Sequence, residues 1–471
     1  MKKILSVMIL LCSVSILFGQ NPKYVFLFIG DGMSTPQRMI ADEFARKLEH
    51  GQLSINTLPN HATTRTASAN SLVTDSAAAA TAIACGEKTN NGRIGMSADG
   101  KRKLVSLAEV AKEKGKKVGI VTSVTITHAT PAGFYAHRPS RSQTYEIGLD
   151  LIKSGFDYFG GGGAQNYDNK ESPEYKGSIY DLAAKAGYKV AKGREEFEAI
   201  KPGCGKVFVR GCEGALPYEI NADGKVPTLA EFTAKGIELM QDHPNGFFMM
   251  VEGGAVDWCG HSNEAAANLR EVLALDKAVR VALDFAKKHP DETLIVVTGD
   301  HETGGMTMGF SGTGYALYMD RLINQKCSIG KFDEIVKKAQ KENGKFSFED
   351  AKKLLAEYFG FQFSGKGAMV LTEKQIKTLQ KAYEKDVKNQ EKLKEALQEK
   401  PDESKALKKK YKTNRFANAA RIIMNEKAGI GWTSGAHTAL PVLTTSTGVK
   451  AELFTGFIDN TDISKKMKSI F

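Results

Sequence analysis

Histidine and cysteine are both scarce in this chain of 471 residues, which contains nine histidines and six cysteines. Cys12 lies in an N-terminal leader, where Lys2 and Lys3 precede an apolar run over 4–18. This pattern predicts a signal peptide over residues 1–20 and therefore an exported protein, periplasmic or secreted. No later run is apolar enough over a sufficient length to predict a membrane span.

The five cysteines beyond the leader are an odd number, so at least one thiol lacks an intrachain partner. Export permits disulfides, and the preferred pair is Cys204 with Cys212, which are expected to flank a short loop or hairpin. Cys259 lies between two candidate metal ligands, but a buried structural cysteine is the preferred interpretation.

The formal charge of +11 comes without any nucleic-acid recognition motif, so nucleic-acid recognition is not expected. Much of the excess lies in a Lys/Glu-rich stretch over 374–421, which is typical of solvated helix faces. A mild positive field is still suited to gathering anionic substrates. The glycines over 160–163 lack the Lys-Ser/Thr that ends a nucleotide-binding loop, so a turn after a strand is predicted there.

Continuous apolar runs alternate with helical patterns along most of the chain. The runs lie over 24–29, 118–121, 247–251 and 294–297, and clear helical patterns lie over 104–114 and 263–288. This alternation predicts an α/β fold with a doubly wound, mostly parallel sheet covered by helices on both faces. At this length we expect one elaborated domain or two domains over 21–471.

A charged helical insertion is expected at about 309–432, with helical segments over 331–341 and 373–399. It separates two segments that carry candidate ligands. Two roles are open for it, covering the site and mediating contacts of a homodimer, and the sequence does not choose between them.

Three histidines lie in contexts that suit metal ligands. His261 follows Asp257 at a spacing that puts both on one helical face, and His301 follows Asp300 just past an apolar run. His437 lies in a loop of small residues. For each segment alone, a core histidine or a helix-face ion pair explains the pattern equally well, but together they favour a metal site. Imidazole with carboxylate suits Zn²⁺.

Carboxylates at predicted strand ends suggest a second kind of ion. Asp31, Glu252 and Asp300 accompany the ends of apolar runs, and open α/β sheets place their sites at the carboxyl ends of strands. Carboxylates in excess of the histidines suit Mg²⁺.

Ser76 is the candidate nucleophile. The segment over 74–81 predicts a helix with Thr74 or Asp75 as its cap and Gly86 just past its end. The first turn of a helix favours a bound phosphate, and a metal ion activates a serine hydroxyl. Taken alone, an Ala-rich core helix with a serine near its start is the simpler interpretation.

Six segments together resemble the alkaline phosphatases, metal-dependent phosphomonoesterases with a doubly wound α/β fold, in the order of that family and over 24 to about 461. The matching segments are Gly30-Asp31-Gly32-Met33, Thr74-Asp75-Ser76-Ala77, His128-Ala129-Thr130-Pro131 with Arg141, Glu252-Gly253-Gly254 leading to Asp257 and His261, Thr298 to Gly305 around Asp300-His301, and Ser434-Gly435-Ala436-His437-Thr438.

The resemblance implies two Zn²⁺ ions and one Mg²⁺ ion. It implies one Zn²⁺ held by Asp257, His261 and His437, a second held by Asp31, Asp300 and His301 beside Ser76, and Mg²⁺ held by Asp31, Thr130 and Glu252. Arg141 would grip two phosphate oxygens through its planar fork.

His128 and Trp258 stand where the best-known bacterial member has an aspartate and a lysine. We expect both to lie beside the ligands. Their presence bears on the affinity of the third site for Mg²⁺.

The implied reaction is hydrolysis of small-molecule phosphomonoesters through a phosphoserine on Ser76. The main alternative is a different enzyme class of the same superfamily: a phosphodiesterase, a sulfatase or a cofactor-independent mutase. Sulfatases carry an arginine four residues after the nucleophile, where this chain has Ala80. Diesterases usually lack the third-metal set that Thr130 and Glu252 complete here.

Overall fold

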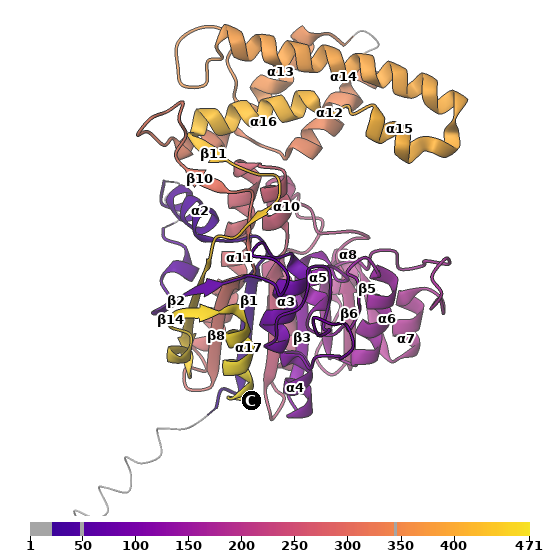
Figure 1. The fold of residues 1–471 in the computed structure, drawn as a ribbon, viewed down its shortest axis with the longest axis vertical. Coiled ribbons are helices and arrows are strands. Elements are labelled where there is room, and N and C mark those ends of the chain that lie inside the picture. Colours follow the sequence, from indigo (N-terminus) through magenta and orange to yellow (C-terminus); the bar gives the residue numbers. More distant parts are fainter. Residues whose placement is uncertain (1–20, 48–50, 343–345) are drawn as a thin grey trace, which may run out of the picture.

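The computed structural model describes residues 21–47, 51–342 and 346–471 (Figure 1). The predicted signal peptide over 1–20, including Cys12, lies outside the described residues. Among the helices of the described ranges, none combines the length and the apolar character that crossing a membrane requires.

A ten-stranded sheet forms the centre of the described structure (Figure 1). Its strands are β1 (Tyr24–Gly30), β2 (Asn60–Arg65), β3 (Lys117–Thr125), β4 (Tyr158–Gly162), β5 (Tyr188–Lys192), β6 (Lys206–Arg210), β7 (Phe247–Gly253), β8 (Thr293–Gly299), β13 (Val442–Gly448) and β14 (Gly456–Asp459). The strand order is β14-β2-β13-β8-β1-β7-β3-β4-β6-β5, and among these strands β13 runs antiparallel to both its neighbours. The predicted mostly parallel sheet is confirmed.

Both faces of the sheet are buried because the strands are apolar on both sides. In β1, Tyr24, Phe26 and Phe28 enter one core while Val25, Leu27 and Ile29 enter the other. Each such side chain contributes roughly 1.5–3 kcal/mol when fully buried. The first core is covered by α2 (Thr35–Lys47), α8 (Gly193–Glu198), α9 (Leu229–Met240), α10 (Ala255–His261) and α11 (Ala265–Ala286), and the second by α3 (Ser76–Cys85), α4 (Leu107–Glu113), α5 (Ala129–Ala132), α6 (Thr144–Ser154), α7 (Ile179–Lys185) and α17 (Asn460–Lys468).

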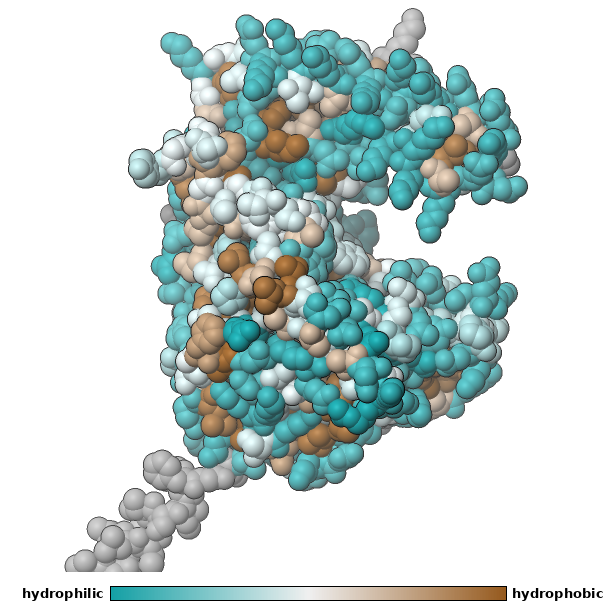
Figure 2. All heavy atoms as spheres, viewed as in Figure 1, coloured by the Kyte–Doolittle hydropathy of each residue, from teal (hydrophilic) through white to brown (hydrophobic). Residues whose placement is uncertain are grey.

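Further helices form a separate layer at one end of the molecule, called the helical layer below (Figure 1). It consists of α12 (Ile329–Glu342), α13 (Phe348–Phe359), α14 (Glu373–Glu399), α15 (Ser404–Lys410) and α16 (Arg415–Ala428). The predicted segments over 331–341 and 373–399 are therefore helical. Figure 2 shows a largely hydrophilic surface on this layer, as solvated helix faces require, and a notch between its overhanging end and the core.

Short elements connect these parts. They are the 3₁₀ helices η1 (Ser54–Asn56), η2 (Glu219–Asn221), η3 (Met319–Asn324), η4 (Pro401–Glu403) and η5 (Ala451–Leu453), the antiparallel pair β10 (Met306–Met308) with β11 (Ile430–Trp432), and the antiparallel pair β9 (Glu302–Thr303) with β12 (His437–Thr438). The β10–β11 pair carries the chain into and out of the segment that contains the helical layer.

The glycines over 160–163 do not form the predicted turn, because Gly160, Gly161 and Gly162 belong to the buried strand β4. Neighbouring backbone explains the composition. A Cβ atom on Gly161 would lie 1.9 Å from the carbonyl oxygen of Thr122, and one on Gly162 would lie 2.2 Å from that of Val124. These positions accept no side chain because adjacent main chain already fills the space.

The preferred disulfide between Cys204 and Cys212 is also wrong. All five described cysteines are free thiols. Cys204 and Cys212 flank the strand β6 rather than a hairpin, and its five residues alone extend about 16 Å at ~3.3 Å each. The Cα atoms of a disulfide lie within about 7 Å, so the strand holds these thiols too far apart.

Glu264 anchors the helical layer to the core. This buried side chain precedes α11, and its Oε1 accepts hydrogen bonds from Gln325 Nε2 and from the backbone N–H of Ile329, both at 2.7 Å. Burial is the main cause that raises the pKa of Glu264 to about 7. The hydrogen bonds require an acceptor oxygen, whereas a buried negative charge costs free energy.

Glu264→Gln is therefore expected to raise the melting temperature at pH 9. The amide oxygen keeps the acceptor role but removes the buried charge. In the wild type, stability falls as the pH rises from the ordinary pKa of 4.5 to about 7, because the folded state holds this proton more tightly than the unfolded state. The gain should vanish below pH 4.5. Thermal melts of both proteins at several pH values test this. The exposed Glu395→Gln is the control, and equal melting temperatures at pH 9 would contradict the role of Glu264.

Candidate active site

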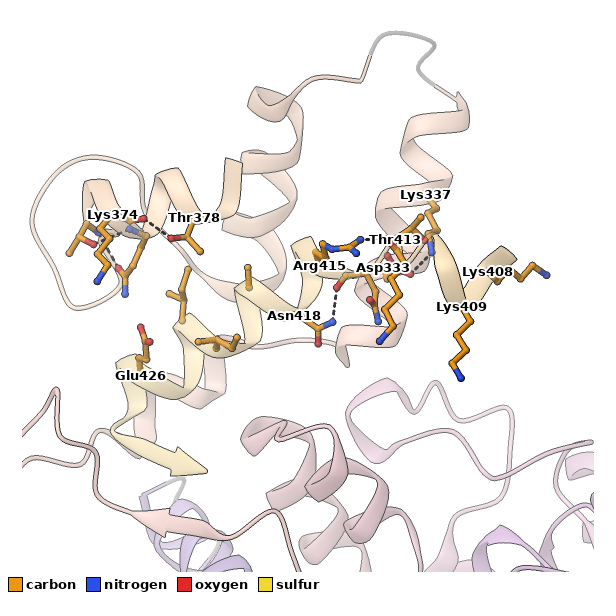
Figure 3. Close-up of a pocket in the computed structure, with 17 residues that line it drawn as sticks. Asp333, Lys337, Lys374, Thr378, Lys408, Lys409, Thr413, Arg415, Asn418 and Glu426 are labelled. Atoms are coloured by element: carbon orange, nitrogen blue, oxygen red, sulfur yellow. Dashed lines mark hydrogen bonds and ion pairs between the residues drawn. The ribbon is translucent and has the colours of Figure 1, made fainter. Parts of the chain in front are cut away.

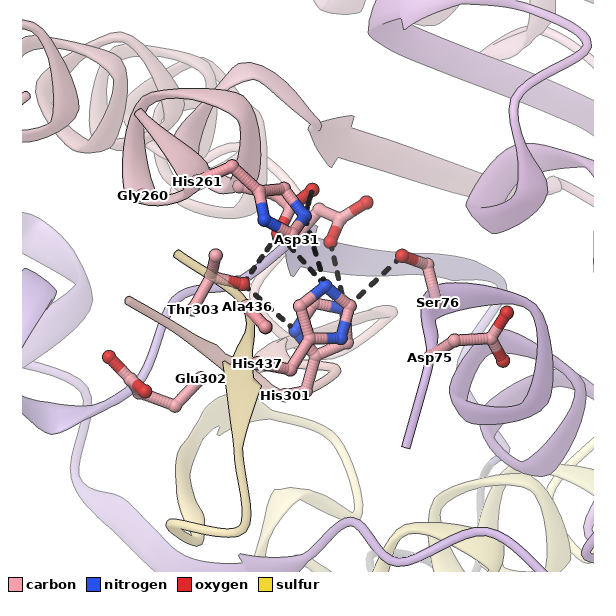
Figure 4. A network of polar contacts seen from close by, with 12 residues as sticks. Asp31, Asp75, Ser76, Gly260, His261, His301, Glu302, Thr303, Ala436 and His437 are labelled. Atoms are coloured by element: carbon pink, nitrogen blue, oxygen red, sulfur yellow. Dashed lines mark hydrogen bonds and ion pairs between the residues drawn. The ribbon is translucent and has the colours of Figure 1, made fainter. Parts of the chain in front are cut away.

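One group of candidate ligands, the first set, consists of Asp257, His261 and His437. Figure 4 labels the two histidines, whose rings lie close together. Asp257 and His261 lie one turn apart on α10, and His261 Nε2 is 3.4 Å from Asp257 Oδ2. His437 comes from β12, and its Nε2 lies 3.4 Å from Asp257 Oδ1 and 3.2 Å from His261 Nε2. The predicted helical spacing is confirmed, and the structure brings His437 to it.

Backbone carbonyls orient both imidazoles of the first set. His261 Nδ1 donates to the carbonyl of Gly435, and His437 Nδ1 donates to that of Thr74, each at 2.8 Å. With Nδ1 occupied by these hydrogen bonds, each ring presents Nε2 to the shared space. Metal-binding histidines are typically fixed in this way.

The second set consists of Asp31, Asp300 and His301. β1 lies between β7 and β8 in parallel register, so Asp31 and Asp300 follow their strands at the same edge of the sheet. His301 Nε2 lies 3.2 Å from Asp31 Oδ1 and 3.4 Å from Asp300 Oδ2. Asp300 Oδ1 is held by the backbone N–H groups of Gly32 and His301.

Ser76 adjoins the second set from the start of α3. Its Oγ lies 3.2 Å from His301 Nε2, and the side chain is buried (Figure 4). Asp75 is the helix cap, accepting from the N–H of Ala78, and Gly86 ends the helix at a φ of +80°. Both predicted helix ends are confirmed. The serine hydroxyl is thus the first side chain inside the helix, next to unpaired backbone donors.

The third set shares Asp31 with the second set and adds Thr130 and Glu252, with His128 beside them. Thr130 Oγ1 donates to Asp31 Oδ2 at 3.2 Å, and Glu252 lies at the end of β7. His128 Nδ1 lies 3.8 Å from Asp31 Oδ2 and 3.7 Å from Glu252 Oε1. The sequence places His128 only beside the ligands, but it lies close enough to join them. Trp258 packs edge-on against the His128 ring, with centroids 6.0 Å apart.

Arg141 links Asp75, the residue before Ser76, to His128 in the third set. Its Nη1 donates to Asp75 Oδ2 at 3.1 Å, and its Nη2 lies 3.2 Å from His128 Nε2. The side chain is partly exposed, as a group that meets a substrate from solution must be. The family resemblance proposed this arginine, and the fold brings it to Asp75, the residue before Ser76.

Unpaired buried atoms show that cations fit this arrangement. Asp31 Oδ1, Asp300 Oδ2, Glu252 Oε1 and His128 Nδ1 are all buried and have no hydrogen-bond partner among the described residues. Buried charges are normally paired or coordinate metals, and these oxygen and nitrogen atoms are metal-ligand types.

The charges of the carboxylates support the same conclusion. Burial, reinforced by the charge of Asp31, raises the pKa of Asp300 well above its ordinary value and also raises that of Glu252. Burial also opposes ionisation of Asp257, but hydrogen bonds from His261 and His437 outweigh it and hold the pKa of Asp257 well below its ordinary value. Cations bound in the second and third sets would favour the ionised form of these buried carboxylates.

Two threonines support the ligands and were missed by sequence reasoning. The Thr303 hydroxyl donates to Asp257 Oδ1 and lies 3.2 Å from His301 Nδ1, so it contacts the first and second sets together. The Thr122 hydroxyl donates to Glu252 Oε2. Thr303 lies in the Thr298–Gly305 motif, which was a usable signal. Thr122 lies in an apolar strand, and nothing in its neighbourhood of sequence marks it.

A large cavity elsewhere holds none of these groups. It measures about 800 Å³ within the helical layer and is bordered by basic side chains such as Lys337, Lys374, Lys408, Lys409 and Arg415 (Figure 3). Neither histidine nor cysteine lines it. The candidate nucleophile and the candidate metal ligands lie instead near the carboxyl edge of the sheet.

The family model for alkaline phosphatase matches residues 22–471. The chain belongs to the alkaline phosphatase family. It is 32% identical over 461 residues to alkaline phosphatase 3 of Bacillus subtilis (strain 168), covering 94% of this chain and 88% of that protein.

Solved alkaline phosphatases share the fold. The cold-active enzyme of a psychrophilic Shewanella species has a TM-score of 0.78 at 26% identity, covering 95% of this chain and 99% of that one. The Thermus thermophilus enzyme has a TM-score of 0.77 at 26% identity, covering 96% and 92%. The protein is therefore an alkaline phosphatase by class, and its family and fold support hydrolysis of phosphate monoesters. The family depends on metals, in agreement with the candidate sets.

Proposed function

We propose that this protein hydrolyses small phosphomonoesters through a phosphoserine on Ser76, with two Zn²⁺ ions in the first and second sets and Mg²⁺ in the third. The observation that carries the proposal is the buried Ser76 hydroxyl 3.2 Å from His301, at the shared edge of three ligand sets. The predicted leader over 1–20 supports export to the periplasm or beyond. We also propose that the protein forms a homodimer.

The residues proposed to hold the ions are those that the chain brings together: Asp257, His261 and His437 for the first, Asp31, Asp300 and His301 for the second, and Asp31, Thr130 and Glu252 with the adjacent His128 for the third. When bound, such ions polarise phosphoryl oxygens, lower the pKa of a coordinated hydroxyl and stabilise a departing oxygen.

The chain itself supplies position and charge. Ser76 Oγ forms a bond to phosphorus as the ester P–O bond breaks and the alcohol departs, and water then cleaves the phosphoserine to phosphate. Arg141 is suited to bind two phosphate oxygens through its fork, while Asp75 accepts from its Nη1 and limits its freedom. Free N–H groups at the start of α3 add a fixed positive dipole.

Ser76→Ala is expected to abolish the phosphoserine and lower turnover of p-nitrophenyl phosphate by several orders of magnitude. The fold should survive because Asp75 caps α3 and alanine is favourable inside a helix. Turnover, labelling with radioactive phosphate and zinc content test this together. Ser464→Ala is the matched control, because this buried helical serine bonds to Ala84 at the far end of α3.

Unchanged turnover in Ser76→Ala, or phosphate trapped on another residue, would overturn the proposed nucleophile. Assay of bis-(p-nitrophenyl) phosphate beside the monoester separates the proposal from its phosphodiesterase alternative. Preference for the diester in the wild type would favour that alternative.

His128→Asp is expected to tighten Mg²⁺ binding at the third set. The wild-type imidazole lies 3.7 Å from Glu252 Oε1 and offers nitrogen, which suits Zn²⁺, whereas a carboxylate offers the oxygen that Mg²⁺ prefers. Titration of zinc-loaded protein with Mg²⁺ should show a dissociation constant lowered by roughly tenfold or more, within the range by which site neighbours alter metal affinity. His243→Asp, at a histidine distant from the three sets, is the control, and equal Mg²⁺ affinities would argue against a ligand role for His128.

Arg141→Ala is expected to weaken phosphate binding while leaving the metal sets intact. Each charge-assisted hydrogen bond of the guanidinium contributes roughly 1.5–3 kcal/mol, so the Ki for inorganic phosphate should rise by about tenfold or more. Turnover at saturating substrate should fall less. Arg141→Lys should give an intermediate Ki, because it keeps the charge without the fork. Loss of zinc with an unchanged phosphate Ki would show that Arg141 is structural.

A further inference from the structure

The link between α10 and α11 has an unusual backbone. Asn263 lies two residues after His261, and its φ of +49° places it in the left-handed region. Asparagine tolerates this region better than most residues, but the conformation still needs support from its surroundings. Part of that support is local, because the Asn263 N–H donates to the Gly260 carbonyl at 2.8 Å.

The carboxamide of Asn263 joins two segments that are far apart in the sequence. Nδ2 donates to the Gly260 carbonyl at 3.0 Å and to the Ser434 carbonyl at 2.7 Å. Both amide hydrogens are therefore used, one on the end of α10 and one on the loop that leads to His437. This side chain ties together the backbones on either side of the first set.

Other hydrogen bonds of that loop attach it to β9 and the residue that follows β9, or to the ring of a candidate ligand. Gly304 N–H donates to the Ala436 carbonyl at 2.9 Å, and β12 pairs with β9, which fixes the loop to the strand beyond β8. His261 also reaches the loop through Gly435, but that contact uses the ligand ring itself. The Asn263 carboxamide bridges α10 and the loop without using either ligand ring.

The helical layer supports the same residue. Asn425 on α16 is buried, and its Nδ2 donates to the Asn263 carbonyl at 2.7 Å. α16 leads directly into β11 and then to Ser434. The helical layer therefore hydrogen-bonds the backbone of Asn263 through Asn425. The side chain of Asn263 in turn hydrogen-bonds Ser434, in the segment that follows the layer.

We propose that Asn263 is a positioning residue that sets the separation of His261 and His437 and thereby the metal affinity of the first set. The inference rests on the proposed metal-dependent function. Metal–nitrogen bonds tolerate little error in ligand position, and loss of a supporting hydrogen bond typically weakens metal binding roughly 10–100-fold. No other described side chain bonds to both Gly260 and Ser434 carbonyls.

Asn263→Gly tests the carboxamide separately from the backbone conformation. Glycine adopts a positive φ without strain, so the turn is kept while the carboxamide is removed. The dissociation constants for Zn²⁺ are measured by competition with a chelator, together with zinc per chain and the visible absorption of the Co²⁺-loaded protein. We expect one ion to bind roughly 10–100-fold more weakly, with an altered Co²⁺ spectrum, and the remaining ions to bind as in the wild type.

The matched control is Asn221→Ala. Asn221 on η2 also bridges the core and the helical layer, through hydrogen bonds with Ser328 at 2.8 and 2.9 Å, but it contacts no ligand set. Its loss should lower stability and leave Zn²⁺ affinity unchanged. Asn263→Asp adds a second variant, because it keeps the size of the side chain while removing the donors.

Asp257→Ala distinguishes failure of the positioning role of Asn263 from failure of the first set as a metal site. If it weakens one Zn²⁺ ion while Asn263→Gly and Asn263→Asp bind all ions like the wild type, the positioning role is wrong and the first set stands. If Asp257→Ala itself leaves Zn²⁺ binding unchanged, the first set as proposed is wrong. Equal loss of Zn²⁺ affinity in Asn221→Ala would reduce Asn263 to a general structural contact and overturn the inference.

Discussion

Repulsion among buried carboxylates is the constraint on which the rest of the site depends. Asp31, Asp300 and Glu252 lie fully buried at the ends of three adjacent parallel strands, and one oxygen of each carboxylate has no hydrogen-bond partner among the described residues. Parallel strands in register bring their carboxyl ends together, so the fold that creates the sheet also creates this concentration of negative charge. The arrangement becomes favourable with cations among the oxygens. The family's dependence on metals thus follows from the geometry of its sheet.

The histidines of the first set are positioned differently, because they come from segments that the register of the sheet does not align. His261 ends a helix, and His437 begins the short strand β12, which follows the helical layer in the chain. Each ring is oriented by a hydrogen bond from Nδ1 to a carbonyl of another segment, and the carbonyl for His437 belongs to Thr74, two residues before Ser76. The ligand geometry therefore depends on tertiary packing of the whole catalytic core.

Local pattern was sufficient wherever one segment determined its own structure. The apolar runs became β1, β3, β7 and β8, the Asp257–His261 spacing became a helical face, and the six motifs contain the candidate ligands that the fold brings together. The failures came from contacts distant in sequence. The glycines of β4 are required by the backbone of β3, and the thiols flanking β6 are separated by a strand that looked like a loop. The Thr122 hydroxyl donates to Glu252, which is 130 residues away in the sequence, and no local periodicity predicts such a contact.

The start of α3 shows why an aspartate precedes the serine. A serine in the cap position uses its hydroxyl oxygen to accept hydrogen bonds from the backbone of the first turn. Asp75 takes that role by accepting from Ala78, and its other oxygen accepts from Gly92 and Arg141. Ser76 is thereby released from helix capping, and its hydroxyl faces His301 instead. One carboxylate thus begins the helix, holds the arginine, and leaves the adjacent oxygen available for chemistry.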